Sequence, residues 1–175
     1  DDYGQAGLEG TDIGLRAHGL TIHSQGKFKN MYGTGEEDVE TGLNEIGSED
    51  DGPEGIVVFG YYKPVSKFIK AAKARWPDVY IMLVSRIGPD KVAGQLNTTE
   101  SRKDIYISQV VPSPYDEIMA VSAEYHYALK NYLVHRDQVD KYTYNFASHY
   151  DYKSIEGYIV GRFAVEVLKN MDIYA

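Results

Sequence analysis

Hydrophobic and polar positions along the chain follow two periods, one typical of strands and one typical of helices. Short apolar runs at Ile56–Phe59, Val79–Val84 and Ile105–Val110 have the length and composition of strands, and we expect the first two to be fully buried. Apolar residues three or four positions apart predict helices around them. Strands that alternate with helices predict an α/β lobe, Rossmann-like or flavodoxin-like, with a mostly parallel sheet and helices on both faces.

The remaining segments extend this pattern to nearly the whole chain. Leu20–Gln25 alternates apolar and polar residues and is predicted as a further strand. In the helix from Asp116 to Leu133 the expected apolar face is Ile118, Val121, Tyr125, Ala128, Leu129 and Tyr132, and in the last helix it is Ile155, Ile159, Phe163, Val167 and Leu168. The predicted helices are Gly4–His18, Glu36–Ile46, Pro64–Ala74, Pro89–Leu96, Asp116–Leu133 and Ser154–Met171.

Composition narrows the possible functions. The 175 residues include 18 basic and 26 acidic side chains, for a net charge of −8, and no run of Lys or Arg of the kind that nucleic-acid binding requires. Cysteine is absent, which excludes a cysteine-based metal site, a thiol nucleophile and disulfide bonds. No apolar run approaches the roughly 20 residues that span a bilayer as a helix.

Familiar catalytic motifs are also absent. The five histidines do not have the spacing of a metal site, and neither a phosphate-binding loop nor a Gly-x-Ser-x-Gly element occurs. We therefore expect no metal, no cofactor and no catalytic residues. An enzyme on a flavodoxin-like scaffold remains an alternative, and its acid or base would have to come from Asp1, Asp2 or Arg86.

Polar and aromatic side chains follow two of the predicted strands directly. Tyr61 and Tyr62 come after the strand that ends at Phe59, and Ser85 and Arg86 follow the strand that ends at Val84. Ligands of open parallel sheets bind at the carboxyl ends of the strands, so these four residues are candidate ligand contacts. Ordinary loop capping is the alternative for both pairs.

A series of motifs, in order along the chain, resembles the type I periplasmic binding proteins. The closest branch is the leucine/isoleucine/valine-binding-protein-like group of ABC-transporter solute receptors. The motifs are Asp2-Tyr-Gly-Gln-Ala-Gly7, Ile56-Val-Val-Phe-Gly-Tyr-Tyr62 with Phe68-Ile-Lys-Ala-Ala-Lys73, Tyr106-Ile-Ser-Gln-Val-Val-Pro-Ser-Pro114 and Ser154-Ile-Glu-Gly-Tyr-Ile-Val-Gly-Arg-Phe163.

The resemblance implies a fold of two α/β lobes that close on a small solute. Residues 1–134 would form the second lobe and residues 135–175 the return crossover and closing helix. The implied ligand-binding residues are Tyr3, Tyr61, Tyr62, Ser85 and Arg86, and the implied hinge is Pro112, Ser113 and Pro114. Amino-acid binders of the family often offer an acid to the ligand's ammonium group where this chain has Ser85-Arg86. An amino-acid-like ligand is thus less expected than an anionic or neutral one.

The resemblance also implies that a strand is missing. The first strand of the lobe, central in the 2-1-3-4-5 order, would precede Asp1, and its absence would leave unpaired backbone groups beside the sheet. We therefore expect the chain to be a fragment, completed by the missing first lobe or by another chain.

Two binding functions follow from the resemblance. The first is non-catalytic solute binding as the extracytoplasmic receptor of an ABC transporter, periplasmic or extracellular, with a membrane permease as partner. The second is the ligand-binding ectodomain of a cyclase-linked or kinase-linked membrane receptor. The possible glycosylation site Asn97-Thr98-Thr99 and the acidic insertion Glu49–Asp51 favour this second function.

Overall fold

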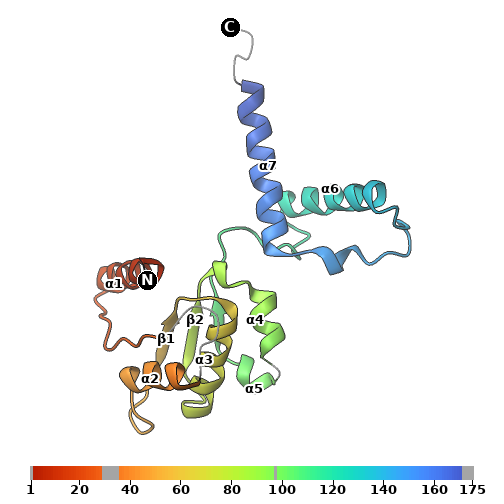
Figure 1. The fold of residues 1–175 in the computed structure, drawn as a ribbon. Helices are drawn as coiled ribbons and strands as arrows, with labels where there is room; N and C mark the ends of the chain where they lie inside the picture. Colours follow the sequence, from red (N-terminus) through yellow and green to blue (C-terminus); the bar gives the residue numbers. More distant parts are fainter. Residues whose placement is uncertain (1, 29–35, 97, 171–175) are drawn as a thin grey trace. The chain divides into compact units, whose positions relative to one another are not determined.

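A computed structural model describes residues 2–28, 36–96 and 98–170 (Figure 1). The chain divides into two compact units, Asp1–Ser108 and Gln109–Ala175. The elements are α1 (Asp2–Ala17), α2 (Glu36–Ile46), β1 (Gly55–Val58), α3 (Tyr62–Arg75), β2 (Tyr80–Leu83), η1 (Ser85–Ile87), α4 (Pro89–Gln95), α5 (Thr99–Arg102), β3 (Ile105–Ile107), α6 (Ala120–Arg136), η2 (Phe146–His149) and α7 (Tyr152–Asn170).

The first unit is an α/β lobe built on a parallel sheet of three strands in the order β1-β2-β3. Ile56 lies opposite Ile81 between β1 and β2, and Met82 lies opposite Tyr106 between β2 and β3. Helix α3 makes the crossover from β1 to β2, as parallel pairing requires. The three strands and the α/β class predicted from the sequence are confirmed. Strands β2 and β3 are shorter than predicted, and β1 begins and ends one residue earlier than its apolar run.

One face of this sheet meets the hydrophobic core. The strands contribute Ile56, Val58, Ile81 and Leu83, and the core extends into α2, α3 and α4. Figure 1 shows α2 and α3 packed together on that side. Its fully buried members include Leu43, Val65, Phe68, Ile69, Ala72, Ile81, Val92 and Leu96. The spacing of apolar residues placed these helices correctly because each presents one continuous stripe to the sheet.

The other face of the sheet is exposed. Val57 in β1 is 40% exposed, Tyr80 and Met82 in β2 are 49% and 48% exposed, and Tyr106 in β3 is 55% exposed. The prediction that the first two strands are fully buried is therefore wrong, since their burial alternates along each strand. A strand with apolar side chains at every position is fully buried only when other elements pack on both faces of the sheet. No layer of helices covers the second face in the part of the chain that the structure describes.

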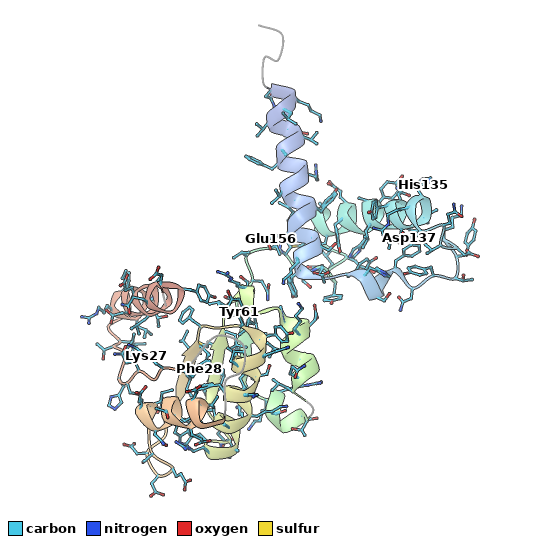
Figure 2. The ribbon with its side chains drawn as sticks, in the orientation of Figure 1. Lys27, Phe28, Tyr61, His135, Asp137 and Glu156 are labelled. Carbon is cyan, nitrogen blue, oxygen red and sulfur yellow. The ribbon has the colours of Figure 1, made fainter. Side chains whose placement is uncertain are left out.

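The strand predicted at Leu20–Gln25 does not form, and residues 20–28 have no regular secondary structure. A strand needs a neighbour for its backbone groups, and this segment packs against α2 instead. The Ser24 hydroxyl donates to the Ile46 carbonyl at 2.7 Å, and Gly26 lies so close to α2 that a Cβ there would sit 2.1 Å from the Gly42 carbonyl oxygen. The observed alternation of exposure thus reflects packing on a helix, with Phe28 stacked on Phe68 of α3 (Figure 2).

A charged side chain also lies inside the first unit. Lys73 of α3 is buried, and its ammonium group donates to the carbonyl oxygens of Val79 at 2.6 Å and Pro77 at 3.2 Å. Burial lowers the pKa of Lys73, because the charged form loses hydration. The lysine fixes the turn that leads from α3 into β2.

The second unit contains α6, η2 and α7. Helix α6 begins at Ala120 rather than at the predicted Asp116, and Ile118 lies before it and is 94% exposed. This later start corrects the predicted apolar face. The buried residues of α6 are Ser122, Tyr125 and Leu133, whereas Tyr132 is exposed.

Aromatic rings cluster around the buried Tyr125 in the second unit. Tyr125 contacts Tyr150 and Tyr158, and the His126 ring stacks on Tyr150 with centroids 4.0 Å apart. Arg162 of α7 pairs with Glu124 of α6.

The predicted apolar face of the last helix is also largely wrong. Ile155 is its one buried position among residues 152–170, and Phe163, Val167 and Leu168 are exposed. Met171, where the predicted helix ends, lies outside the described residues. The apolar spacing predicted the helix but could not show how much of it would be covered.

Candidate ligand-binding site

Three residues from separate segments meet at the carboxyl end of the sheet. Tyr3 is in the first turn of α1, Tyr61 lies between β1 and α3, and Arg86 is in η1 just after β2. Parallel neighbouring strands end at the same edge of a sheet, which places the loops after β1 and β2 side by side. Figure 2 shows Tyr61 beyond the end of the strands.

The Arg86 guanidinium links the two tyrosines. Its Cζ lies 4.9 Å from the centre of the Tyr3 ring and 5.7 Å from the centre of the Tyr61 ring. Nη2 of Arg86 also donates a long hydrogen bond, 3.5 Å, to the Tyr61 hydroxyl. Attraction between the cation and the negative faces of the rings holds the guanidinium in this position.

Helix α1 reaches the sheet through a close contact with Phe59, the residue that follows β1. The Tyr3 ring meets the Phe59 ring edge-on with centroids 6.3 Å apart. A Cβ on Gly7 would lie 2.5 Å from the same ring, so only glycine permits this approach. Sequence reasoning did not include Phe59 and Gly7 in the site, although Gly7 at i+4 from Tyr3 was a usable signal for one shared helix face.

The Tyr3 hydroxyl is buried without a hydrogen-bond partner in the described structure. Burial raises the pKa of Tyr3, and the nearby Arg86 charge opposes that rise. A buried hydroxyl without a partner costs about 1–3 kcal/mol, because it has lost its hydrogen bonds to water. Among the described residues the site therefore contains an unused donor.

Two positive features, the Arg86 guanidinium and the first turn of α3, lie at this edge. None of the ion pairs formed by the described residues includes Arg86. Helix α3 begins at Tyr62 with no side-chain cap, because the Tyr61 side chain at its N-cap makes no capping hydrogen bond. The first backbone N–H groups of a helix carry partial positive charge. Arg86 and the start of α3 thus lie at one edge of the sheet.

Two of the five predicted ligand-binding residues lie apart from this cluster. Tyr62 packs against the core, and the Lys91 ammonium lies 5.2 Å from the centre of its ring. Ser85 opens η1 and is half-buried, with its carbonyl accepting a hydrogen bond from the Gly88 N–H. The structure brings Tyr3, Tyr61 and Arg86 together, and the binding role of all five residues stays a prediction.

The predicted hinge lies in the second unit and is held by α6. Pro114 is fully buried, and its carbonyl oxygen lies 2.6 Å from Nε2 of His126. The Ser122 hydroxyl donates to the Ser113 carbonyl at 3.1 Å. The predicted hinge begins at Pro112, a few positions after the division between the two units. The hinge role, and the lobe boundary at residue 134, stay predictions about a larger fold.

Other candidate features give no second site in the described residues. No group of three or more His, Asp or Glu side chains there could hold a metal ion, and no described helix is long and apolar enough to cross a membrane. Asp1, a candidate of the enzyme alternative, and Asn97, the possible glycosylation site, lie outside the described residues.

The fold and site together define one α/β lobe with candidate ligand contacts at the carboxyl end of its sheet. A solved structure titled a possible leucine/isoleucine/valine-binding protein, from Rhodopirellula baltica SH 1, matches 98% of this chain with a TM-score of 0.70 and 24% identity. An extracellular ligand-binding receptor from Verminephrobacter eiseniae ef01-2 matches 81% of the chain with a TM-score of 0.60 and 18% identity.

These comparisons confirm the resemblance at the level of the fold. The chain has the fold of part of these binding proteins, since it covers 42% of the first matched structure and 36% of the second. No family model and no curated protein matches the chain.

Proposed function

We propose that this chain binds a small solute at the carboxyl end of its sheet and that it catalyses no reaction. The convergence of Tyr3, Tyr61 and Arg86 from three segments of the chain carries this proposal. Two aromatic rings and a cation make a surface with both stacking area and directed hydrogen-bond donors, which is how small-molecule sites combine affinity with specificity.

In the proposed protein the chain is one lobe of an extracytoplasmic receptor of an ABC transporter, periplasmic or extracellular. The matched structures support this, because each is more than twice as long as the part that this chain covers. Among the described strands β1 pairs with β2 alone, and this free edge and the exposed face of the sheet also support further covering segments. A first lobe or another chain would cover them, and a membrane permease would receive the solute.

Solute binding works here by closure of two lobes. The solute contacts both lobes and stabilises the closed arrangement by its higher affinity for that state. The second lobe then needs only side chains at the tips of its strands, and this is where Tyr61 and Arg86 lie. The proposed hinge, Pro112–Pro114, would follow the last strand of this lobe.

The ectodomain of a membrane receptor is the second candidate function. It is favoured by the match to a structure titled an extracellular ligand-binding receptor. The same site would then serve signalling through a cyclase or a kinase rather than transport. A gene that continues into a membrane-spanning segment and such a catalytic region would support this candidate.

The proposal is tested by replacing Tyr61 in the full-length natural protein. A thermal-shift screen of small solutes first identifies a ligand, and isothermal titration calorimetry then compares the wild type with Tyr61→Ala. We expect roughly tenfold weaker binding or more, because truncating a central aromatic contact commonly costs over 1 kcal/mol. Equal dissociation constants would contradict the assigned site.

Tyr142→Ala is the matched control. Tyr142 is 84% exposed and lies in the second unit, outside the cluster. Its replacement removes the same side chain and should leave the dissociation constant unchanged. Far-UV circular dichroism of both variants checks that the fold is intact.

A further inference from the structure

Most of the hydrogen-bond donors of Arg86 are not used in the described structure. Arginine has five N–H donors in a planar fork, and one of these groups makes a long hydrogen bond to Tyr61. None of the ion pairs of the described residues uses it. The charge is therefore held in place by aromatic rings and is not neutralised by a side-chain carboxylate of the described chain.

The surroundings of Arg86 favour an acidic partner over a basic one. The start of α3, which has no side-chain cap, follows Tyr61 directly and adds partial positive charge at the same edge. A ligand ammonium group placed over the guanidinium would meet like charge. A carboxylate would instead accept two parallel hydrogen bonds from the fork.

The aromatic neighbours prepare Arg86 for this contact. Stacking against Tyr3 and Tyr61 restricts the long side chain before any ligand binds, so less conformational entropy is lost on binding. The buried Tyr3 hydroxyl, which has no partner in the described structure, belongs to the ring next to this guanidinium and is an unused donor of the same cluster.

We propose that the solute presents a carboxylate to Arg86, with the rings of Tyr3 and Tyr61 holding the guanidinium in position. This inference rests on the proposed function and adds the chemical class of the ligand. Small organic carboxylates are thus the preferred solutes of this site, ahead of neutral or purely cationic molecules of the same shape.

The test uses matched pairs of probes with the full-length natural protein. Each pair has one carboxylate and its uncharged amide: benzoate with benzamide, phenylacetate with phenylacetamide, and butanoate with butanamide. Calorimetry should show the carboxylate of at least one pair binding roughly tenfold or more tightly, as expected for a charge-assisted hydrogen bond. Arg86→Gln should reduce that preference to near one, and Arg86→Lys should retain part of it.

The control variant is Arg16→Gln. Arg16 lies at the far end of α1, about 20 Å along the helix from Tyr3, and pairs with Asp12. The Arg16→Gln substitution removes the same charge and should leave the preference for the carboxylate over the amide unchanged. Arg86 is exposed, so its replacement leaves the core intact, and circular dichroism verifies this.

The possible outcomes separate this inference from the proposed function. If no carboxylate is preferred, or if Arg86→Gln keeps the preference, the carboxylate class is wrong. Binding of another solute that is still lost in Tyr61→Ala would then leave the proposed function standing. If that binding is also unchanged in Tyr61→Ala, both fail.

Discussion

At the scale of single residues, the site depends on the close approach of α1 to the sheet at Tyr3 and Gly7. Glycine at position 7 lets α1 approach Phe59, and this approach puts the Tyr3 ring beside Arg86. The Tyr3 hydroxyl is buried as a consequence and finds no partner in the described structure. A group that lowers stability at a proposed binding site is typical of residues retained for function.

Replacing Tyr3 with Phe should therefore separate stability from binding. We expect Tyr3→Phe to unfold at higher urea concentration at pH 8, with a gain of about 1–3 kcal/mol, because the unpaired hydroxyl is gone. Ligand affinity should fall. A loss of stability above about 1 kcal/mol would show that the hydroxyl has a partner.

The stability difference between the wild type and Tyr3→Phe should also depend on pH. Burial raises the pKa of Tyr3 above its ordinary value of 10.0, so above that pH the unfolded chain releases the proton first. The free energy of unfolding of the wild type is thus independent of Tyr3 ionisation below pH 10 and falls as the pH rises from there through the folded pKa. Urea titrations at pH 8 and pH 11 should show the advantage of Tyr3→Phe growing at the higher pH.

The sequence pattern predicted two of the three clustered residues for a physical reason. Tyr61 and Arg86 follow strands whose parallel ends meet at one edge, so periodicity alone brings them together. Tyr3 was expected only through the resemblance. The sequence pattern could not show that the Tyr62 side chain packs against the core and Lys91. Tyr61 and Tyr62 are adjacent, and only the direction in which each side chain leaves the start of the helix decides which one faces the core.

At the scale of elements, the type of each element was predictable and its surroundings were not. The apolar runs of β1 and β2 fit strands buried on both faces, yet one face is exposed in the described chain. The alternation at Leu20–Gln25 fits a strand, yet the segment packs on α2 without a partner strand. A pattern records which side chains are apolar but does not say what covers them.

Two neighbouring residues of β2 test the sidedness of the sheet. Ile81 is fully buried and Met82 is half-exposed on the other face. In the 175-residue chain, Ile81→Ala should cost about 2–5 kcal/mol of unfolding free energy, and Met82→Ala less than about 1 kcal/mol. Urea denaturation of both variants measures this difference.

The same two variants also test whether a further segment covers the exposed sheet face in the full-length protein. If a further segment packs on the second face there, Met82→Ala should cost clearly more in the full-length protein than in this chain. Equal and large costs for both residues in the 175-residue chain would contradict an exposed face.

At the scale of the whole molecule, the chain is an α/β lobe followed by a second unit that contains a cluster of aromatic rings. Among the described residues one edge of β1 is unpaired and one face of the sheet is exposed, and the chain covers 42% of the first matched structure. The α/β class followed from the alternation of strands and helices. The division after Ser108 did not, because no change of composition marks it.

The central claim is that a solute occupies the carboxyl end of the sheet. A crystal structure of the full-length protein with its solute tests this most directly. We predict ligand atoms within hydrogen-bond distance of the Arg86 guanidinium or the Tyr61 hydroxyl. Ligand bound at the amino end of the strands or within the second unit, with this cluster unoccupied, would contradict the account.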